Sequence, residues 1–205
     1  MDNFDIMAED FDTVERVNRA KAIADKIQVH IHEGNKKSAV EYGCGTGLVG
    51  FQLINRFKTI LFVDSSPEMI KQVTRKLEKL NNPAASTLCS DLIGDVSKKL
   101  RADYIFLSLV LHHIKDTKAA LQRFYDMLHD GGRLLIVDVD EEDGSFHAKY
   151  PDFDGHNGFS HSFIVDAALK TGFETATIET FYNDTKVFEG KKNPYSLFIL
   201  DAVKR

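Results

Sequence analysis

Three glycines at alternate positions have the clearest chemical meaning in this sequence. Gly43, Gly45 and Gly47 follow the short apolar run Ser38 to Tyr42, which is predicted to be a buried strand. Glycine adopts positive φ at little cost and lets the backbone approach a ligand closely. The next residues, Leu48 to Phe57, are predicted to form a helix whose first N–H groups can bind a polar ligand. The loop therefore predicts a cradle for a phosphate or a nucleoside.

Three acids stand where predicted strands end. Glu41 lies near the end of the first strand, Asp64 follows the apolar run Thr59 to Val63, and Asp91 follows the short run Ser86 to Cys89. Carboxylates accept hydrogen bonds from ribose hydroxyls and amino groups. A carboxylate beside the glycine loop would repel a pyrophosphate and attract a cationic or donor group. Glu41 thus favours a nucleoside with a positive charge over a dinucleotide.

An NAD-dependent oxidoreductase is an alternative, because the same glycines also fit a dinucleotide fingerprint. Gly45-Thr46-Gly47-Leu48-Val49-Gly50 matches the spacing GxGxxG. Asp64 follows at about the 20 residues expected of an acid that binds the NAD ribose. The glycine pattern alone leaves both cofactors open.

Strand and helix patterns alternate along most of the chain, which argues for a parallel sheet with helices on both faces. The last two predicted strands have no helix between them, so an antiparallel strand is expected at the C-terminus. We expect an α/β fold, a Rossmann-like doubly wound sheet of seven strands, mostly parallel, in a single domain over residues 1–205. The predicted helices span residues 13–31, 48–57, 67–80, 116–128 and 163–170, and the predicted strands residues 38–42, 59–63, 86–89, 104–111, 133–139, 173–181 and 195–203.

Composition excludes several classes of function. The formal net charge of −5 gives no basic field for nucleic acid. No apolar run reaches the roughly 20 residues that cross a bilayer, and the acidic start Met1-Asp2-Asn3-Phe4-Asp5 is unlike a signal peptide. Cys44 and Cys89 are too few for a disulfide framework. We expect a cytoplasmic protein that binds neither nucleic acid nor membrane.

Taken together, these motifs resemble the class I S-adenosylmethionine-dependent methyltransferases along nearly the whole chain. The Leu111-His112-His113 ending is similar to small-molecule enzymes of that family, including the quinone-biosynthesis type. The resemblance implies S-adenosylmethionine as cofactor, a small-molecule methyl acceptor, and a monomer or homodimer. It is carried by Glu41 to Gly47 as the glycine loop, Asp64 as the ribose acid, Ser90-Asp91-Leu92 as the adenine contact, Asp103 to His113 as the fourth-strand signature and Leu128 to Ile136 as the fifth.

The resemblance also implies roles for individual residues. The glycine loop would hold the methionine part of the cofactor, Asp64 the ribose, and Met69 the adenine ring. Each has a structural alternative, because Asp64 can cap a helix, Met69 can fill the core and Asp91 can belong to a turn. The implied cofactor-binding set is Glu41, Gly43, Cys44, Gly45, Gly47, Asp64, Ser65, Met69, Ser90, Asp91, Leu92 and Ser108.

A general base is required only if the acceptor must lose a proton. His112 and His113 are the candidates, and since successive residues leaving a strand point in opposite directions, one of them is expected to face the pocket. We choose His113, although a histidine that only lines the pocket fits the pattern equally well. Because no clear base stands out, a non-catalytic nucleoside-binding module is a further alternative.

Two segments are expected to cover the pocket. Residues 1–33 are predicted to form an N-terminal helical cap, and residues 140–161, rich in Gly, Phe and His, a lid over the carboxyl edge of the sheet. The acids 138–143 followed by His147, His156 and His161 match no tight ligand spacing. Metal-dependent catechol-type relatives need an acid after the fourth strand, where this chain has Ser108. We therefore expect no metal.

Overall fold

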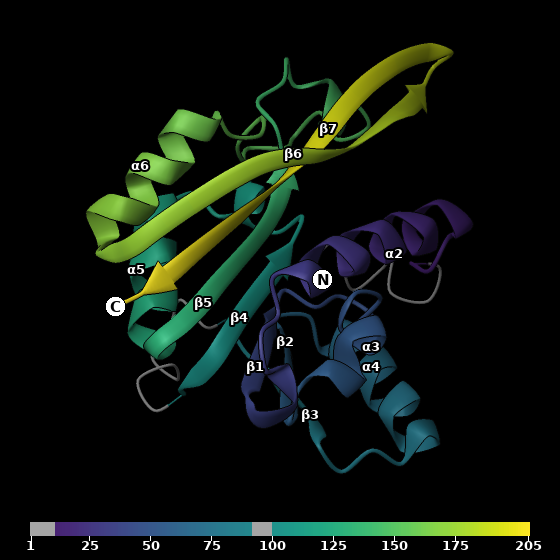
Figure 1. The fold of residues 1–205 in the computed structure, drawn as a ribbon. Coiled ribbons are helices and arrows are strands. Elements are labelled where there is room, and N and C mark those ends of the chain that lie inside the picture. Colours follow the sequence, from purple (N-terminus) through teal and green to yellow (C-terminus); the bar gives the residue numbers. More distant parts are fainter. Residues whose placement is uncertain (1–10, 92–99) are drawn as a thin grey trace.

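Seven strands form one sheet at the centre of the molecule, and the computed structural model describes residues 11–91 and 100–205 around it. The strand order is β3-β2-β1-β4-β5-β7-β6 (Figure 1). The strands are β1 (Ser38–Tyr42), β2 (Thr59–Asp64), β3 (Ala85–Cys89), β4 (Ala102–Ser108), β5 (Leu128–Val139), β6 (Phe173–Phe188) and β7 (Lys191–Lys204).

Five of these strands pair with one another in the parallel sense, as predicted. β1 pairs with β2 and with β4, β2 pairs with β3, and β4 pairs with β5, all in the parallel sense. β7 is antiparallel to both of its neighbours, β5 and β6. The prediction of a mostly parallel, doubly wound seven-stranded sheet with an antiparallel C-terminal strand is confirmed.

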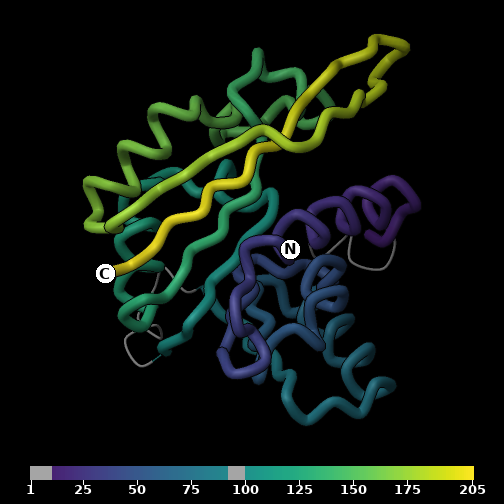
Figure 2. The backbone as a smooth tube through the Cα atoms, viewed as in Figure 1, coloured from purple at the N-terminus to yellow at the C-terminus, as the bar shows by residue number. Residues whose placement is uncertain are grey.

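Helices cover both faces of the sheet, because each face carries its own apolar core. Residues of α2 (Val14–Val29), α3 (Gly50–Leu53) and α4 (Pro67–Leu80) are buried in one core. Residues of α5 (Thr117–Met127) and α6 (His161–Thr171) are buried in the other. In Figure 2 the chain passes from the purple α2 through the blue β1–α4 half to the green and yellow C-terminal half.

Polar side chains begin four of these helices. Thr13, Ser66, Asp116 and Ser160 each accept a hydrogen bond from the backbone N–H three residues later. Such caps satisfy N–H groups that have no partner inside the helix. Asp116, the first residue of the predicted helix 116–128, is thus the N-cap of α5.

The structure differs from the predicted elements where glycine or a left-handed residue bends the chain. The predicted helix 48–57 is only α3 followed by a 3₁₀ turn, Ile54–Arg56. The predicted strand 104–111 ends at Ser108, since Leu109 has φ 57° and a 3₁₀ turn, Leu111–His113, follows.

The C-terminal hairpin is the largest departure from the predicted elements. β6 and β7 have 16 and 14 residues, and they pair from Phe173↔Lys204 to Phe188↔Lys191. The outer half of this hairpin projects beyond the sheet (Figure 1). Polar residues predominate in it, so the sequence shows only a weak form of the apolar alternation by which a half-buried strand is recognised.

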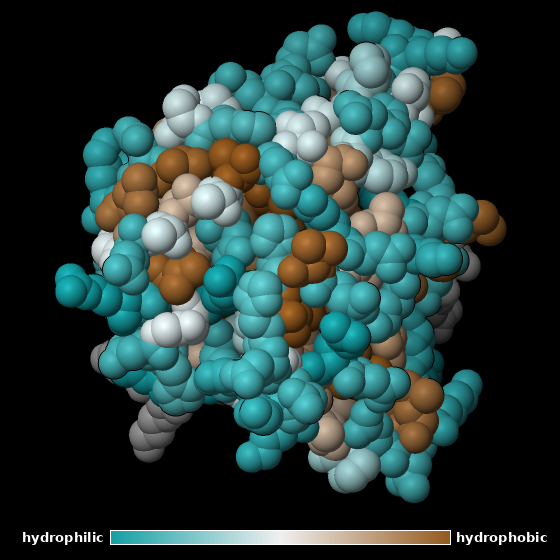
Figure 3. Space-filling view, viewed as in Figure 1, coloured by the Kyte–Doolittle hydropathy of each residue, from teal (hydrophilic) through white to brown (hydrophobic). Residues whose placement is uncertain are grey.

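The visible face in Figure 3 is mainly hydrophilic, with hydrophobic side chains in separate groups. Residues 11–91 and 100–205 contain no helix with the length and apolar character that a membrane crossing requires.

Replacing Phe124 by alanine tests the α5 core. Phe124 is fully buried and meets the Tyr42 ring, just before the glycine loop, at 5.1 Å in an edge-on contact. We expect Phe124→Ala to lower the free energy of unfolding by about 3–5 kcal/mol. Phe163→Ala, on the exposed side of α6, is the matched control, with a loss below half of that. Urea denaturation measures both, and equal losses would contradict the assignment of Phe124 to the core.

Candidate functional site

The glycine loop lies at the carboxyl end of β1 and makes a tight turn into α3. Gly43 has φ 65° and Gly47 has φ 81°. A Cβ atom at Gly43 would lie 2.5 Å from a methyl group of Val110, and one at Gly47 would lie 2.7 Å from the Phe51 ring. Both positions therefore require glycine, for backbone conformation and for space.

Asp64 joins the glycine loop to the end of β2. Its Oδ2 accepts the Gly45 N–H at 2.7 Å, and its Oδ1 accepts the Ser66 N–H at 2.9 Å. The cap of α4 is Ser66, whose hydroxyl accepts the Met69 N–H at 3.2 Å. The alternative in which Asp64 serves only as the cap of that helix is therefore wrong.

Glu41 lies buried beneath the loop, with 2% of its surface exposed. Its Oε1 accepts the Gly50 N–H at 3.1 Å, and Oε2 has no hydrogen-bond partner among the described residues. Burial raises the pKa of Glu41 to about 8, and the negative charge of Asp64 acts in the same direction. A buried acceptor without a partner is unfavourable unless a ligand satisfies it. The carboxyl group thus fits the ammonium end of an amino-acid cofactor.

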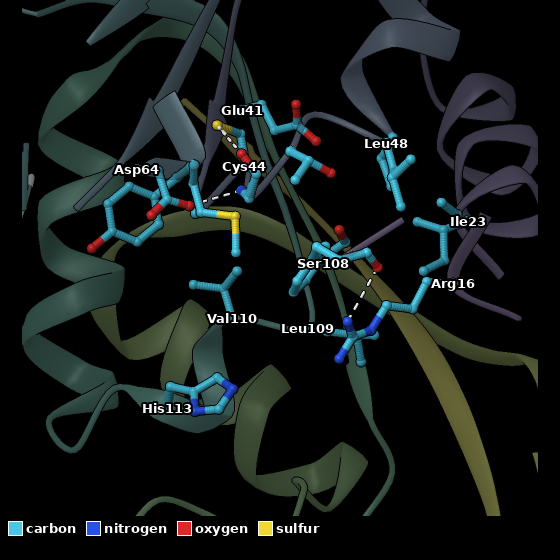
Figure 4. A pocket seen from close by; sticks show the side chains of 18 of the residues that line it. Arg16, Ile23, Glu41, Cys44, Leu48, Asp64, Ser108, Leu109, Val110 and His113 are labelled. Carbon is cyan, nitrogen blue, oxygen red and sulfur yellow. Dashed lines mark hydrogen bonds between the residues drawn. The ribbon is translucent and has the colours of Figure 1, made fainter. Parts of the chain in front are cut away.

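A cavity of about 420 Å³ opens beside this loop. Glu41, Cys44 and Asp64 lie at one end of it and His113 at the other, with Arg16 and Ile23 of α2 on a third side (Figure 4). Of the residues expected to bind cofactor, the structure brings together in the cavity wall Glu41, Gly43, Cys44, Gly45, Asp64, Ser65, Met69, Asp91 and Ser108.

Three of the expected residues are placed otherwise. Gly47 and Ser90 are not in the cavity wall, since Gly47 closes the turn and the Ser90 N–H donates to the Asp64 carbonyl at 2.9 Å. Leu92 lies outside the described residues. Asp91, in contrast, lies in the wall, where its Oδ1 accepts a hydrogen bond from the Tyr42 hydroxyl at 3.4 Å.

Sequence reasoning missed part of the wall. Arg19 and Ile23 of α2 and Val110 after β4 also line the cavity. Arg19 and Arg16 both lie within the predicted helix 13–31 and are three positions apart, so helical spacing could have placed them on one face. Nothing in the sequence signals Val110, because its position depends on the turn that begins at Leu109.

The segment before α2 is attached to the glycine loop. Lys76 of α4 donates to Asp12 and to the Thr46 carbonyl, both at 2.8 Å. The Thr46 hydroxyl donates to Asp12 as well. The Arg16 guanidinium lies 4.1 Å from the centre of the Phe11 ring. These contacts attach residues 11–16 to the glycine loop, and the first ten residues of the predicted cap 1–33 lie outside the described residues.

The rings of His112 and His113 lie side by side, with centres 4.2 Å apart, but in different surroundings. His112 is 1% exposed, and its Nδ1 lies 2.5 Å from Oδ1 of the fully buried Asp138, whereas His113 lies in the cavity wall. Although part of His113 is exposed, desolvation of its ring by the cavity wall lowers the pKa of His113 to about 4, and the adjacent His112 acts in the same direction. The choice of His113 as the pocket-facing member of the pair agrees with this placement.

The segment 140–161 packs over His112. The His156 N–H donates to the His112 carbonyl at 2.8 Å, and a Cβ atom at Gly155 would lie 2.3 Å from that same oxygen. Gly155, which we considered as a pivot of a lid, is thus required for close packing. Whether the segment opens as a lid stays a prediction.

Comparison with known proteins now assigns the family. A family model described as a methyltransferase domain matches residues 40–134, which include the glycine loop, Asp64 and the strand-end histidines. The family model, the curated relatives and the solved structures all indicate a class I S-adenosylmethionine-dependent methyltransferase. Together they decide against the NAD-dependent alternative.

The relatives support the same assignment. The methyltransferase domain is 30% identical over 155 residues to an uncharacterized methyltransferase of Schizosaccharomyces pombe, covering 69% of this chain and 55% of that protein. It is 27% identical over 137 residues to malonyl-[acyl-carrier protein] O-methyltransferase 1 of Ilyobacter polytropus, covering 65% and 49%. The chain spans about half the length of the curated relatives it matches.

The fold also matches a solved methyltransferase. Phosphoethanolamine N-methyltransferase 2 of Haemonchus contortus, in complex with phosphomonomethylethanolamine and S-adenosylhomocysteine, superposes with a TM-score of 0.71. The identity is 18%, and the match covers 90% of this chain and 52% of that enzyme. At this identity the likeness shows the fold.

Replacing Glu41 by glutamine tests the burial of its carboxyl group. Because the pKa of Glu41 is raised to about 8 in the folded state, the folded protein holds a proton that the unfolded chain has lost. The contribution of this group to stability is complete below the unfolded pKa and is lost as the pH rises through about 8. We expect Glu41→Gln to gain stability over the wild type between pH 5 and 9.

Thermal unfolding of the cofactor-free protein across this range measures the difference. Glu78→Gln, at an exposed acid of α4, is the control and should follow the wild type at every pH. Parallel curves for Glu41→Gln and the wild type would contradict the raised pKa.

Proposed function

We propose that this methyltransferase transfers a methyl group to a small-molecule acceptor. The observation that carries the proposal is a single cavity that reaches from the glycine loop and Asp64 to His113. Its volume of about 420 Å³ lies in the range of small-molecule pockets. When bound, S-adenosylmethionine supplies an electrophilic methyl group on a sulfonium.

The cofactor end of the cavity is assigned to the residues nearest the loop. Backbone groups of Gly43, Cys44 and Gly45 hold the methionine part, and Glu41 accepts from its ammonium group. Asp64 accepts from the ribose hydroxyls, which suits a carboxylate already fixed by two N–H donors. Ser65, Met69, Ser90, Asp91 and Leu92 are assigned to the adenosine, and Ser108 to the methionine end.

The acceptor end is assigned to the opposite wall. Leu109, Val110 and Ile114 supply apolar surface there, and α2 closes the cavity from the side. The guanidinium groups of Arg16 and Arg19 favour an acceptor with a negative charge. Walls on these sides orient the acceptor for in-line displacement.

His113 stays our candidate for the group that meets the acceptor atom. Its imidazole is neutral at neutral pH, so it can accept a hydrogen bond or a proton there. The quinone-biosynthesis subtype, the cytoplasmic location and the monomeric or homodimeric state also remain predictions. A non-catalytic nucleoside-binding module would bind cofactor without turnover.

Calorimetric titration tests the cofactor end. We expect S-adenosylhomocysteine and S-adenosylmethionine to bind and NAD to give no heat. Asp64→Ala should weaken both sulfur nucleosides by roughly tenfold or more, because the ribose hydroxyls lose a charged acceptor. Asp126→Ala, at an exposed residue of α5, is the control that leaves affinity unchanged. Micromolar NAD binding without heat from either sulfur nucleoside would contradict the proposal.

Radiolabelled methyl transfer tests the acceptor end. The protein is incubated with methyl-labelled S-adenosylmethionine and, separately, with the small-molecule fraction and the macromolecular fraction of a cell extract. We expect label in the small-molecule products, and less of it with Arg16→Ala because a wall residue is lost. Label only in protein or nucleic acid would overturn the small-molecule assignment, and cofactor binding with no label in either fraction would favour the non-catalytic module.

A further inference from the structure

Three imidazole rings from two distant segments meet at the acceptor end of the cavity. His112 and His113 follow β4, and His147 belongs to the 3₁₀ turn Ser145–His147 after β5. The ring centre of His112 lies 4.2 Å from that of His113 and 4.9 Å from that of His147. One nitrogen from each of the three rings lies within 4.8 Å of the other two.

A buried carboxylate orients the first of these rings. Asp138 is fully buried, and its Oδ1 lies 2.5 Å from Nδ1 of His112. It also accepts the backbone N–H groups of His112 at 3.2 Å and of Val139 at 2.7 Å. Nδ1 is therefore engaged, and Nε2 remains as the nitrogen that can bind a ligand. A carboxylate behind a histidine in this way is the usual outer partner of a metal ligand.

The second ring is fixed by packing and has an unsatisfied nitrogen. His147 stacks on Phe153 with ring centres 3.6 Å apart and planes 9° from parallel. It is 8% exposed, and its Nδ1 is buried without a hydrogen-bond partner among the described residues. An unpaired polar atom in a buried place is costly unless a ligand satisfies it.

The third ring connects the cluster to the cavity. His113 is exposed and lies in the cavity wall together with Val110 and Ile114. In Figure 4 its ring lies at the end of the pocket away from Glu41 and Asp64. Bonds of about 2.0–2.1 Å in a tetrahedral site place nitrogens about 3.3 Å apart. Rotation of this exposed side chain can close the remaining gap.

We propose that His112, His113 and His147 bind one divalent transition-metal ion of the zinc class. Three neutral imidazoles with room for a further ligand are the donor set of catalytic zinc, and they are unsuited to Mg²⁺ or Ca²⁺, which take oxygen ligands. Asp138 is a positioning residue that holds His112. The spacing rules applied to 138–161 did not find this site, because two of its ligands lie before that segment.

The ion would lie among the three imidazoles, beside the cavity wall at His113. Its remaining coordination position would then face the acceptor end of the cavity. There it would bind an oxygen, nitrogen or sulfur atom of the acceptor, a role that rests on the proposed function. In this role His113 would be a metal ligand and not the group that accepts a proton from the acceptor. Metal binding itself requires neither cofactor nor acceptor and is tested alone.

Titration of the full chain with Co²⁺ tests the site, since its visible absorption reports the ligand geometry. We expect one ion per chain, displaced by Zn²⁺ and not by Mg²⁺. His113→Ala and His147→Ala should each weaken binding by roughly tenfold or more. His129→Ala, at an exposed histidine at the amino end of β5, is the matched control. Cooperative thermal unfolding checks that each variant is folded.

The outcomes separate the two proposals. The metal site is overturned if Co²⁺ does not bind saturably. It is also overturned if the affinity for Co²⁺ is the same in His113→Ala and His147→Ala as in His129→Ala. If S-adenosylhomocysteine binds normally in that case, the proposed function stands. If Co²⁺ binds and no sulfur nucleoside does, the metal site stands and the proposed function fails.

Discussion

The parallel pairing of β4 between β1 and β5 is the constraint on which both candidate sites depend. β1 and β4 are neighbours in the sheet, although β2 and β3 separate them in the chain. At such a point the connections leave in opposite directions and open a crevice at the carboxyl ends of the strands. The glycine loop fills one side of this crevice and the turn after β4 fills the other. Val110 of that turn lies so close to Gly43 that the two sides fit only with glycine in the loop.

The acids of the site are held in buried or hydrogen-bonded places. Burial of Glu41 and Asp138 costs solvation free energy, which hydrogen bonds from backbone N–H groups only partly offset. The rest of the fold supplies stability through two apolar cores, so the site can keep groups that are unfavourable in the free protein. Glu41 and His147 both have a buried polar atom without a partner in the described part of the chain. Both atoms lie where a ligand is expected.

Much of the sheet and of the cofactor end was predictable from the sequence, because local chemistry determines them. Residue type alone predicts the conformation at several places: the apolar run 38–42, the glycines after it, and Pro67 at the start of α4. Asp64 and Asp91 could be placed because parallel strands end at one edge. The outer half of the β6–β7 hairpin could not, since polar residues predominate there and leave only a weak apolar alternation.

The acceptor end was harder to predict, because contacts between distant segments form it. The turn at Leu109 brings Val110 and His113 into the cavity, and no residue type at Leu109 signals positive φ. The histidine cluster joins residues that are more than 30 positions apart, through packing of Phe153 and Gly155 against the turn. Loop contacts of this kind follow from tertiary packing, which spacing does not encode.

A crystal structure of the complex with S-adenosylhomocysteine tests the central claim most directly. The account predicts the ribose at Asp64, the amino-acid end at Glu41 and the glycine loop, and the sulfur directed along the cavity toward His113. A nucleoside bound outside the β1–β4 crevice, or one whose sulfur points away from the histidine end, would contradict it.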